Sequence, residues 1–280
     1  MELEKIIDNI AAAAEQAAAN NDEYLDTYDG LLHCSKCKEP TQCRVTIFGE
    51  ERTVRCICRC KQEEKAREEE ERRKEQKAQK IQRMRIKGFD KAEMQNWTFE
   101  NDDGKKPQVT RAAKAYCKNF ERFSSEGKGL IFYGDVGTGK TYAAACIANE
   151  LISQGVPVLM TNFSRIINRL QGSFEGRQEY LDSLNEFDLL IIDDLAAERN
   201  TEFVNETVYT IIDSRYRAGL PMIVTTNVKF KDMTDAPEIA RKRIYSRVLE
   251  RCHPIEVGGE DRRKQTLFND FAEMQRLLGM

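Results

Sequence analysis

Residues 134–141 read GDVGTGKT and place three glycines and a lysine directly after the apolar run Leu130-Ile131-Phe132-Tyr133. An apolar run, a glycine-rich turn and then residues 140–153 with helical character predict a buried strand, a tight loop and a helix. The turn matches the pattern G-x-x-x-x-G-K-[ST] at every position. Because it lies between a strand and a helix, the segment predicts a phosphate-binding P-loop rather than an ordinary turn.

The residue types in this loop suit a nucleoside triphosphate with Mg²⁺. Glycines allow backbone N–H groups to point inward at phosphate oxygens, and the N-terminus of the following helix adds its dipole. Lys140 is expected to reach the β- and γ-phosphates, and Thr141 to ligate Mg²⁺. The residues predicted to bind the nucleotide are Gly134, Gly137, Thr138, Gly139, Lys140, Thr141 and Tyr142.

Polar residues end two further predicted strands, 187–193 and 221–226. Asp193 is placed to hold Mg²⁺, and Asp194 to polarise the attacking water. Asn227 could hold that water beside the γ-phosphate, although asparagine is also common where strands turn. The guanine signature N-K-x-D is absent after Asn227, which disfavours a GTPase.

From about residue 89 the sequence alternates between predicted strands and helices. The strands are expected at 128–133, 156–161, 187–193, 221–226 and 253–257, and the helices at 140–153, 201–218 and 262–278. This alternation predicts an α/β fold with a parallel sheet covered by helices on both faces. An extra strand between the P-loop strand and the strand ending at Asp193 would be the arrangement of multi-subunit ATPases.

The segments before residue 89 differ in composition. Residues 1–60 hold six of the nine cysteines and open with an alanine-rich stretch whose apolar residues recur at helical spacing over 3–17. Residues 61–87 carry eleven basic and seven acidic side chains and predict a solvated helical linker that ends at Gly88. We therefore expect domains at 1–60 and 89–280 with a linker at 61–88.

The cysteines of residues 1–60 form two groups that suit a tetrahedral Zn²⁺ site. The first is the C-x-x-C of Cys34 and Cys37, and the second contains Cys56, Cys58 and Cys60. The residues between the groups alternate as in a hairpin that turns at Gly49-Glu50, which would bring the groups together. Cys34, Cys37, Cys58 and Cys60 are the expected ligands. Cys56 stays possible, and an iron–sulfur cluster or free thiols are the alternatives.

Other features of the sequence indicate the cellular compartment of the protein. The N-terminus MELEKIIDNI lacks the basic start of a signal peptide, and no apolar stretch reaches the roughly 18 residues that span a membrane. Nine cysteines without a secretory signal fit a reducing cytoplasm. Cys117, Cys146 and Cys252 lie in apolar surroundings and are expected to be ordinary buried residues. We expect a cytoplasmic protein without a membrane segment.

Four motifs occur in order: GDVGTGKT, IIDDLAAE at 191–198, TTN at 225–227 and SRVLER at 246–251. Together they resemble the DnaC/DnaI-type replicative helicase loaders of the AAA+ class over about residues 90–280. The cysteine-rich segment also looks like that of the loaders from Gram-positive bacteria and their phages. The resemblance implies an AAA+ ATPase, using ATP, Mg²⁺ and Zn²⁺, that binds a hexameric replicative helicase and helps to place it on single-stranded DNA.

The resemblance also implies roles for individual residues. Arg251 looks like the arginine finger, with Arg247 assisting, and Arg263 looks like sensor 2, while Asn227 looks like sensor 1. A finger offered to a neighbouring subunit implies nucleotide-dependent self-assembly. Asp194 stands where many AAA+ proteins have glutamate, so we expect a weak ATPase that a partner or DNA stimulates. Only about 20 residues follow the last strand, so the usual helical lid should be minimal.

Contact with single-stranded DNA requires aromatic and basic side chains. Phe163 is the candidate for stacking on bases, although an aromatic residue at a helix start is more often a packing residue. The candidates for phosphate contacts are Arg165, Arg169, Arg241, Lys242 and Arg243. Three other functions remain open: a transposition helper ATPase of the same AAA+ class, a small-molecule P-loop kinase, and a zinc-stabilised adaptor with a vestigial nucleotide site.

Overall fold

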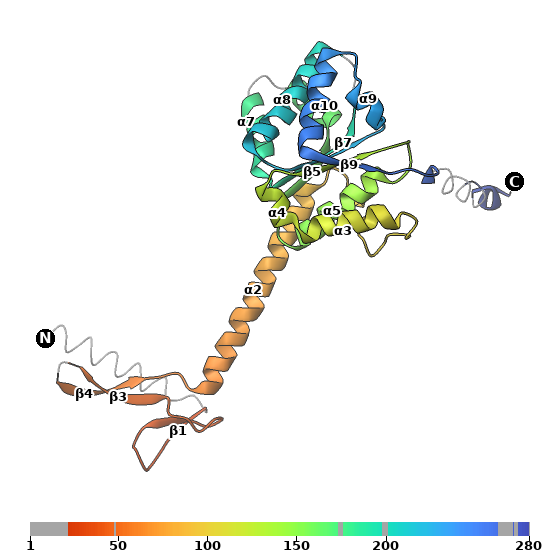
Figure 1. The fold of residues 1–280 in the computed structure, drawn as a ribbon. Helices are drawn as coiled ribbons and strands as arrows, with labels where there is room; N and C mark the ends of the chain where they lie inside the picture. Colours follow the sequence, from red (N-terminus) through yellow and green to blue (C-terminus); the bar gives the residue numbers. More distant parts are fainter. Residues whose placement is uncertain are drawn as a thin grey trace. The chain divides into compact units, whose positions relative to one another are not determined.

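The structure is a computed structural model that describes residues 22–47, 49–172, 176–197, 201–262, 271 and 274–279 (Figure 1). The chain divides into two compact units, Met1–Lys77 and Ala78–Met280. The helical stretch expected at 3–17 and most of the helix expected at 262–278, including Arg263, lie outside the described residues. Within the described residues, no helix is long and apolar enough to cross a membrane.

The first unit contains two antiparallel hairpins. Strand β1 (Glu23–Leu25) pairs with β2 (Leu32–Cys34), and β3 (Gln42–Ile47) pairs with β4 (Glu50–Arg55). The second hairpin confirms the turn predicted at Gly49-Glu50, where Gly49 adopts a φ of 84° that disfavours other residues. The first hairpin was not predicted, because three-residue strands are too short to show an alternating pattern.

Helix α2 (Arg59–Gly88) confirms the predicted helix of the charged run and begins two residues earlier than 61. Its early part carries i,i+4 ion pairs, such as Glu69 with Arg73 at 3.0 Å. The helix ends at Gly88, which is buried, and a Cβ there would lie 2.7 Å from the carbonyl oxygen of Val158. The boundary between the two compact units falls within this helix, after Lys77.

The second unit is built on a five-stranded sheet in the order β6-β7-β8-β5-β9, with every pair parallel. The strands are β5 (Gly129–Tyr133), β6 (Val158–Asn162), β7 (Leu189–Leu195), β8 (Met222–Thr226) and β9 (Cys252–Glu256). The parallel sheet is therefore confirmed. Strand β8 lies between the P-loop strand β5 and the acid-ending strand β7, which confirms the expected extra strand.

Helices cover both faces of this sheet (Figure 1). One face is covered by α3 (Pro107–Lys118), α4 (Phe120–Ser125), α5 (Lys140–Ser153) and the short η1 (Ala92–Asn96). The other carries α6 (Phe163–Gly172), α7 (Arg177–Ser183), η2 (Leu184–Glu186), α8 (Glu202–Ala218), α9 (Phe230–Thr234) and α10 (Ile239–Arg251). The predicted helices at 140–153 and 201–218 correspond to α5 and α8. Each face has its own apolar core, so the sheet forms the middle layer.

A buried arginine, Arg215, forms hydrogen bonds to several backbone segments at the amino end of this sheet. Arg215, near the end of α8, is 0% exposed and donates hydrogen bonds to four backbone carbonyls. The acceptors are Leu184 at 3.2 Å, Phe187 at 2.8 Å, Asp188 at 3.4 Å and Pro221 at 2.6 Å. Burial lowers the pKa of Arg215 to about 10, so the side chain is still charged at neutral pH. These bonds fix the segments that enter β7 and β8.

Candidate functional site

The P-loop runs from the end of β5 into α5. Gly137 has a φ of 76° and Gly139 a φ of 101°, both in the left-handed region that favours glycine. Gly139 is the N-cap of α5, so the first N–H groups of that helix are available to an anion. Thr138 is buried, and its hydroxyl donates to the carbonyl of Asp135 at 2.9 Å. The loop therefore has the backbone expected of a phosphate cradle.

Lys140 lies with its ammonium inside this loop. The side chain is only 5% exposed, and Nζ donates to the carbonyl oxygens of Gly134 at 3.0 Å and Asp135 at 2.7 Å. Two backbone bonds therefore keep the positive charge next to the N–H groups that would bind phosphate oxygens. The contact of Lys140 with the β- and γ-phosphates stays a prediction.

A β-bulge near the end of β7 determines the positions of Asp193 and Asp194. The register between β7 and β8 shifts between Ile192 and Leu195, and Asp194 adopts a φ of 57°. A bulge of this kind re-aims side chains, and it is common next to active sites. The Thr225 hydroxyl donates to Oδ1 of Asp193 at 2.6 Å and accepts from the backbone N–H of Asp194 at 2.9 Å. Thr225 thus orients both acids from the neighbouring strand.

The Asp193 carboxyl has an environment suited to a hard cation. Burial raises the pKa of Asp193, and the neighbouring Asp194 carboxylate raises it further. Hydrogen bonds from the hydroxyls of Thr225 and Thr141, together with the charge of Lys140, act in the opposite direction. A carboxylate beside a threonine hydroxyl provides the oxygen ligands that Mg²⁺ prefers. The residues predicted to hold Mg²⁺, Thr141 and Asp193, are thus brought together.

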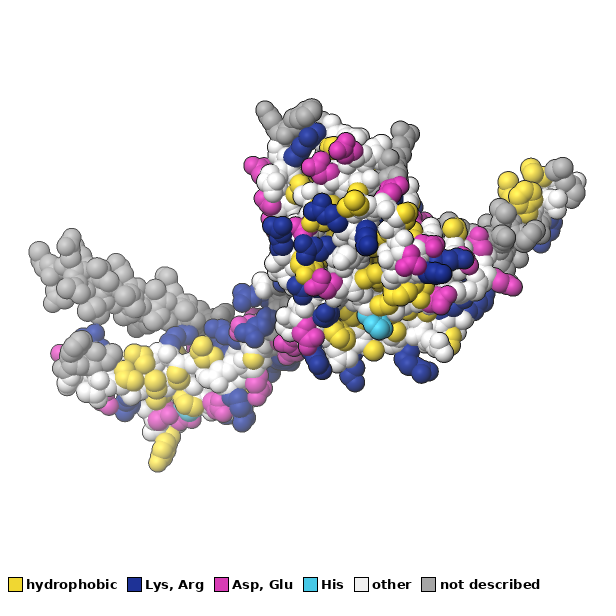
Figure 2. Space-filling model, turned by 45° about the horizontal axis from the view of Figure 1, so that its top comes forward, with side chains coloured by type: hydrophobic (Ala, Val, Ile, Leu, Met, Phe, Trp, Pro, Cys, Tyr) yellow, Lys and Arg dark blue, Asp and Glu magenta, His cyan; other side chains and the backbone are white. Residues whose placement is uncertain are grey.

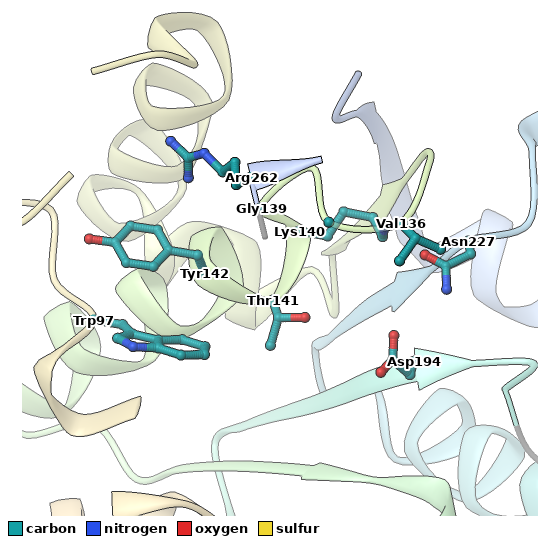
Figure 3. Close-up of a pocket in the computed structure, with 10 residues that line it drawn as sticks. Trp97, Val136, Gly139, Lys140, Thr141, Tyr142, Asp194, Asn227 and Arg262 are labelled. Atoms are coloured by element: carbon teal, nitrogen blue, oxygen red, sulfur yellow. The ribbon is translucent and has the colours of Figure 1, made fainter. Parts of the chain in front are cut away.

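A cavity of about 420 Å³ joins these parts (Figure 3). Its lining consists of Trp97, Val136, Gly137, Gly139, Lys140, Thr141, Tyr142, Asp194, Asn227 and Arg262. Residues from the P-loop, the end of β7 and the end of β8 therefore face one space, as the sequence predicted. The volume is within the range of small-molecule and cofactor sites, roughly 300–1,000 Å³.

Two residues of the lining that come from outside the P-loop, Trp97 and Arg262, were not predicted to lie there. The ring of Trp97 is tilted by 35° against the ring of Tyr142, with centroids 5.8 Å apart, and the Tyr142 hydroxyl donates to the carbonyl of Thr98 at 3.0 Å. The backbone N–H of Arg262 donates to the carbonyl of Gly137 at 3.0 Å, and its side chain bonds to Asp103.

The sequence signals for these two residues differ. Arg262 belongs to the arginine doublet at 262 and 263, of which Arg263 was predicted to contact the nucleotide. The structure places Arg262 at the cavity, and Arg263 lies outside the described residues. Trp97 follows the short η1 and has no sequence pattern around it that indicates a site.

Arg251 is not brought to the cavity of its own chain. It ends α10, and the next residue, Cys252, pairs with Gly129 at the amino end of β5. The P-loop begins after Tyr133, at the other end of the same strand. Five residues at about 3.3 Å each separate the two ends by about 16 Å. Arg251 is therefore placed to act outside its own nucleotide site.

The first unit contains a cluster of four thiols. The Sγ atoms of Cys34, Cys37, Cys58 and Cys60 all lie within 4.8 Å of one another. The Sγ of Cys60 is 3.4 Å from that of Cys34 and 3.3 Å from that of Cys58. Four sulfurs about 2.3 Å from a zinc ion would be about 3.8 Å apart, so the cluster suits tetrahedral Zn²⁺.

The backbone around the cluster favours thiolate ligands. Backbone N–H groups of Glu39 and Cys60 lower the pKa of Cys37 to about 6. Lys38 follows in the left-handed region, with a φ of 61°, and its N–H donates to the carbonyl of Cys34 at 2.9 Å, which closes the turn. The turn therefore presents its two thiols on the same side as those at the start of α2.

The remaining cysteines lie elsewhere. The thiol of Cys56 donates to the carbonyl of Pro40 at 3.4 Å and is not part of the four-thiol cluster. Cys117, Cys146 and Cys252 are buried, as expected, and burial raises the pKa of each thiol to about 12. These three are inert structural residues at neutral pH.

The prediction that Phe163 stacks on DNA bases is wrong. Phe163 is 1% exposed and packs in the core between the sheet and α6, because the first residue of that helix points inward. Among the basic candidates, Arg165 is 60% exposed and pairs with Asp90 at 3.2 Å. Arg169 lies over the ring of Tyr180, 4.1 Å from its centroid. The basic candidates remain at the surface, but they lack the stacking partner.

Several known proteins are similar to this chain. The replicative helicase loader DnaI of Bacillus subtilis is 28% identical over 167 residues, which are 55% of this chain and 52% of DnaI. The replicative helicase loader DnaC of Escherichia coli K12 is 28% identical over 161 residues, 56% of this chain and 63% of DnaC. The chain thus spans about half to two thirds of the length of these relatives.

The fold comparison agrees with the sequence comparison. A crystal structure of DnaI has a TM-score of 0.54 at 27% identity, covering 64% of this chain and 99% of that chain. The predicted resemblance to DnaC/DnaI-type proteins and to their AAA+ fold is therefore confirmed. The family model described as IstB-like ATP binding protein matches residues 60–269, which is most of the chain. The chain belongs to the IstB-like ATP binding protein family.

Proposed function

We propose that this protein is an ATP-dependent loader that binds a replicative DNA helicase and assists its placement on single-stranded DNA. The observation that carries the proposal is the cavity in which Lys140, Asp194 and Asn227 converge. It occurs in a chain whose relatives DnaI and DnaC are named replicative helicase loaders. The proposal assigns the ATP chemistry to the cavity and helicase binding to a separate part of the chain.

Within the cavity each residue has a distinct role. The P-loop and Lys140 would hold the phosphates, and Thr141 with Asp193 would hold Mg²⁺. Asp194 and Asn227 would orient the attacking water. Because the Asp194 side chain is shorter than a glutamate, we expect slow hydrolysis that the helicase or DNA stimulates.

Arginines would complete the site from two sides. Arg262 lines the cavity and would contact the phosphates of its own nucleotide, with Arg263 as the second residue of the doublet. Arg251 cannot reach the cavity of its own chain, so it would act on the nucleotide of a second copy. This arrangement requires self-assembly in the presence of ATP.

The rest of the chain would connect this site to the helicase. Residues 1–60, with Zn²⁺ on Cys34, Cys37, Cys58 and Cys60, would form the helicase-binding domain, and residues 61–88 a helical linker to the ATPase domain at 89–280. We place the protein in the cytoplasm, because nine cysteines, four of them clustered as for a metal, suit a reducing compartment.

Native mass spectrometry tests this proposal. The protein is mixed with the replicative helicase hexamer from the same genome, with and without ATP and Mg²⁺. The expected result is a defined complex, which is lost when residues 1–60 are deleted. A helicase that stays unbound under every condition contradicts the loader function. In that case binding to a transposase and double-stranded DNA would identify a transposition helper instead.

A further inference from the structure

Helix α10 carries three arginines on one face, and we call Arg243, Arg247 and Arg251 the arginine row. They stand at i, i+4 and i+8, about 6 Å apart along the helix. The row lies over α8, and Figure 2 shows basic side chains gathered on the face formed by these two helices. Its last member is the arginine that cannot reach the cavity of its own chain.

Tyrosines of α8 lie beneath the row. The guanidinium of Arg247 is 4.1 Å from the centroid of the Tyr216 ring, and that of Arg251 is 4.7 Å from the same centroid. Arg243 lies over a different ring, that of Tyr209, at 4.3 Å. One tyrosine therefore contacts two arginines, which restricts both planar groups by stacking.

Tyr216 is itself held in place by α10. Its hydroxyl donates to Oε1 of Glu250 at 2.6 Å, and Glu250 immediately precedes Arg251. The ring is thus fixed at its polar end by the same turn of helix whose arginine it supports. A hydrogen bond to a charged carboxylate is among the stronger side-chain bonds.

Arg247 and Arg251 differ in the strength of their remaining contacts. Arg247 forms an ion pair with Asp213 at 3.2 Å, and Asp213 is only 12% exposed. Within the described part of the chain, Arg251 forms no ion pair with an acid. It donates to the carbonyls of Glu126 at 3.3 Å and Tyr216 at 3.4 Å, both longer than the usual 2.9–3.0 Å. The orientation of Arg251 therefore depends on the Tyr216 ring more than that of Arg247 does.

We propose that Tyr216 is a positioning residue that holds Arg251 in the orientation in which it contacts the triphosphate bound to a second copy of this chain. The inference rests on the proposed function, since it assumes an ATPase that assembles. A head-to-tail contact would bring Arg251 of one copy to the cavity of the next, because Arg251 and the P-loop lie at opposite ends of β5. The row is positive and the triphosphate is negative, so the two surfaces are complementary in charge.

The test compares Tyr216→Leu with Tyr216→Phe and with the matched control Tyr209→Leu. The leucine removes the ring under Arg251 and the phenylalanine keeps it. The control removes the ring under Arg243, which also touches Arg247 and Asp213, but leaves Tyr216 beneath Arg251. ATP turnover is measured with helicase and single-stranded DNA present. We expect kcat to fall about tenfold to a hundredfold for Tyr216→Leu, with KM for ATP unchanged. Tyr216→Phe loses only the hydrogen bond to Glu250 and should show a smaller fall, and Tyr209→Leu should stay close to wild type. Circular dichroism and thermal melting check that each variant folds.

Mixing two variants tests whether Tyr216 positions Arg251 for the nucleotide of a second copy or only stabilises its own chain. Asp194→Asn supplies an intact Tyr216 and Arg251 on a chain that cannot hydrolyse ATP, while Tyr216→Leu supplies an intact cavity. We expect the mixture to exceed the sum of the separate rates. The control mixes Tyr216→Leu with the double variant Asp194→Asn/Tyr216→Leu. Because neither chain then has the Tyr216 ring, the ATP turnover rate should not exceed the sum of the separate rates.

Two outcomes would overturn the inference: wild-type kcat in Tyr216→Leu, or a mixture that only equals the sum of the separate rates. Neither depends on a helicase complex, because both the turnover assay and the mixing assay are repeated without helicase. Recovery in the mixture together with a missing helicase complex would contradict the loader function and leave the role of Tyr216 intact.

Discussion

At the scale of single residues, the nucleotide site depends on side chains that the backbone holds in place. Lys140 is fixed by two carbonyls of its own loop, and Asp193 by the hydroxyl of Thr225. The P-loop residues could be predicted because their pattern lies within eight consecutive positions. Thr225 and Trp97 could not be assigned to the site, because only the folded sheet and the turn after η1 bring them there.

Replacing Lys140 by alanine should abolish ATP binding, because it removes the positive charge inside the phosphate cradle. Trp97 is the only tryptophan in the chain and lines the cavity, so its fluorescence reports on the nucleotide. We expect ATP with Mg²⁺ to change the emission of the wild type, and the Kd of Lys140→Ala to rise at least about a hundredfold, which is near the upper end of what a hydrogen bond to a charged group contributes. An equal titration curve for both proteins would contradict this placement of the phosphates.

At the scale of elements, the sheet, α5, α8 and the charged helix were predictable because their patterns are long and regular. The short hairpin β1–β2 was missed, and Phe163 was misassigned, because nothing in one sequence tells which side of a helix start meets the core. The choice between Cys56 and the pair Cys58 and Cys60 also needed the fold. After the hairpin β3–β4, Cys56 lies against Pro40 and Cys43 and outside the four-thiol cluster.

The four-thiol cluster should bind one zinc ion per chain. Cys60→Ser is expected to lose the metal, since Cys60 contacts two other thiols of the cluster, and the matched Cys56→Ser is expected to keep it. Elemental analysis of the purified proteins measures both. A strong visible absorption band would instead indicate an iron–sulfur cluster, and zinc loss in Cys56→Ser would contradict the ligand set.

Arg215 should be among the most sensitive positions of the second unit. Arg215→Met leaves the carbonyls of residues 184, 187, 188 and 221 without their donor. Since each unsatisfied buried acceptor costs about 1–3 kcal/mol, we expect a loss of about 3 kcal/mol or more in the free energy of unfolding. Arg217→Met removes the ion pair between the exposed Arg217 and Asp213, which keeps its ion pair with Arg247, and should cost less than about 1 kcal/mol. Denaturant unfolding of both variants checks the difference; equal losses would contradict the role of Arg215.

At the scale of the whole molecule, the chain combines a thiol-rich unit with an ATP-binding unit of the IstB-like family. The fold of the second unit followed from its alternating strands and helices, and its class from four motifs in order. Neither pattern tells which unit binds the helicase, because helicase binding depends on surfaces that contact other proteins. The assignment of helicase binding to the first unit therefore requires a direct experiment.

The most direct measurement counts helicase hexamers loaded onto circular single-stranded DNA in the presence of this protein. Circles exclude threading from an end, so each bound hexamer must have been opened or assembled on the strand. We predict loading with the wild type and ATP with Mg²⁺, and little with Lys140→Ala or with a chain that lacks residues 1–60. Equal loading with no protein added, or with Lys140→Ala, would contradict the account of an ATP-dependent loader.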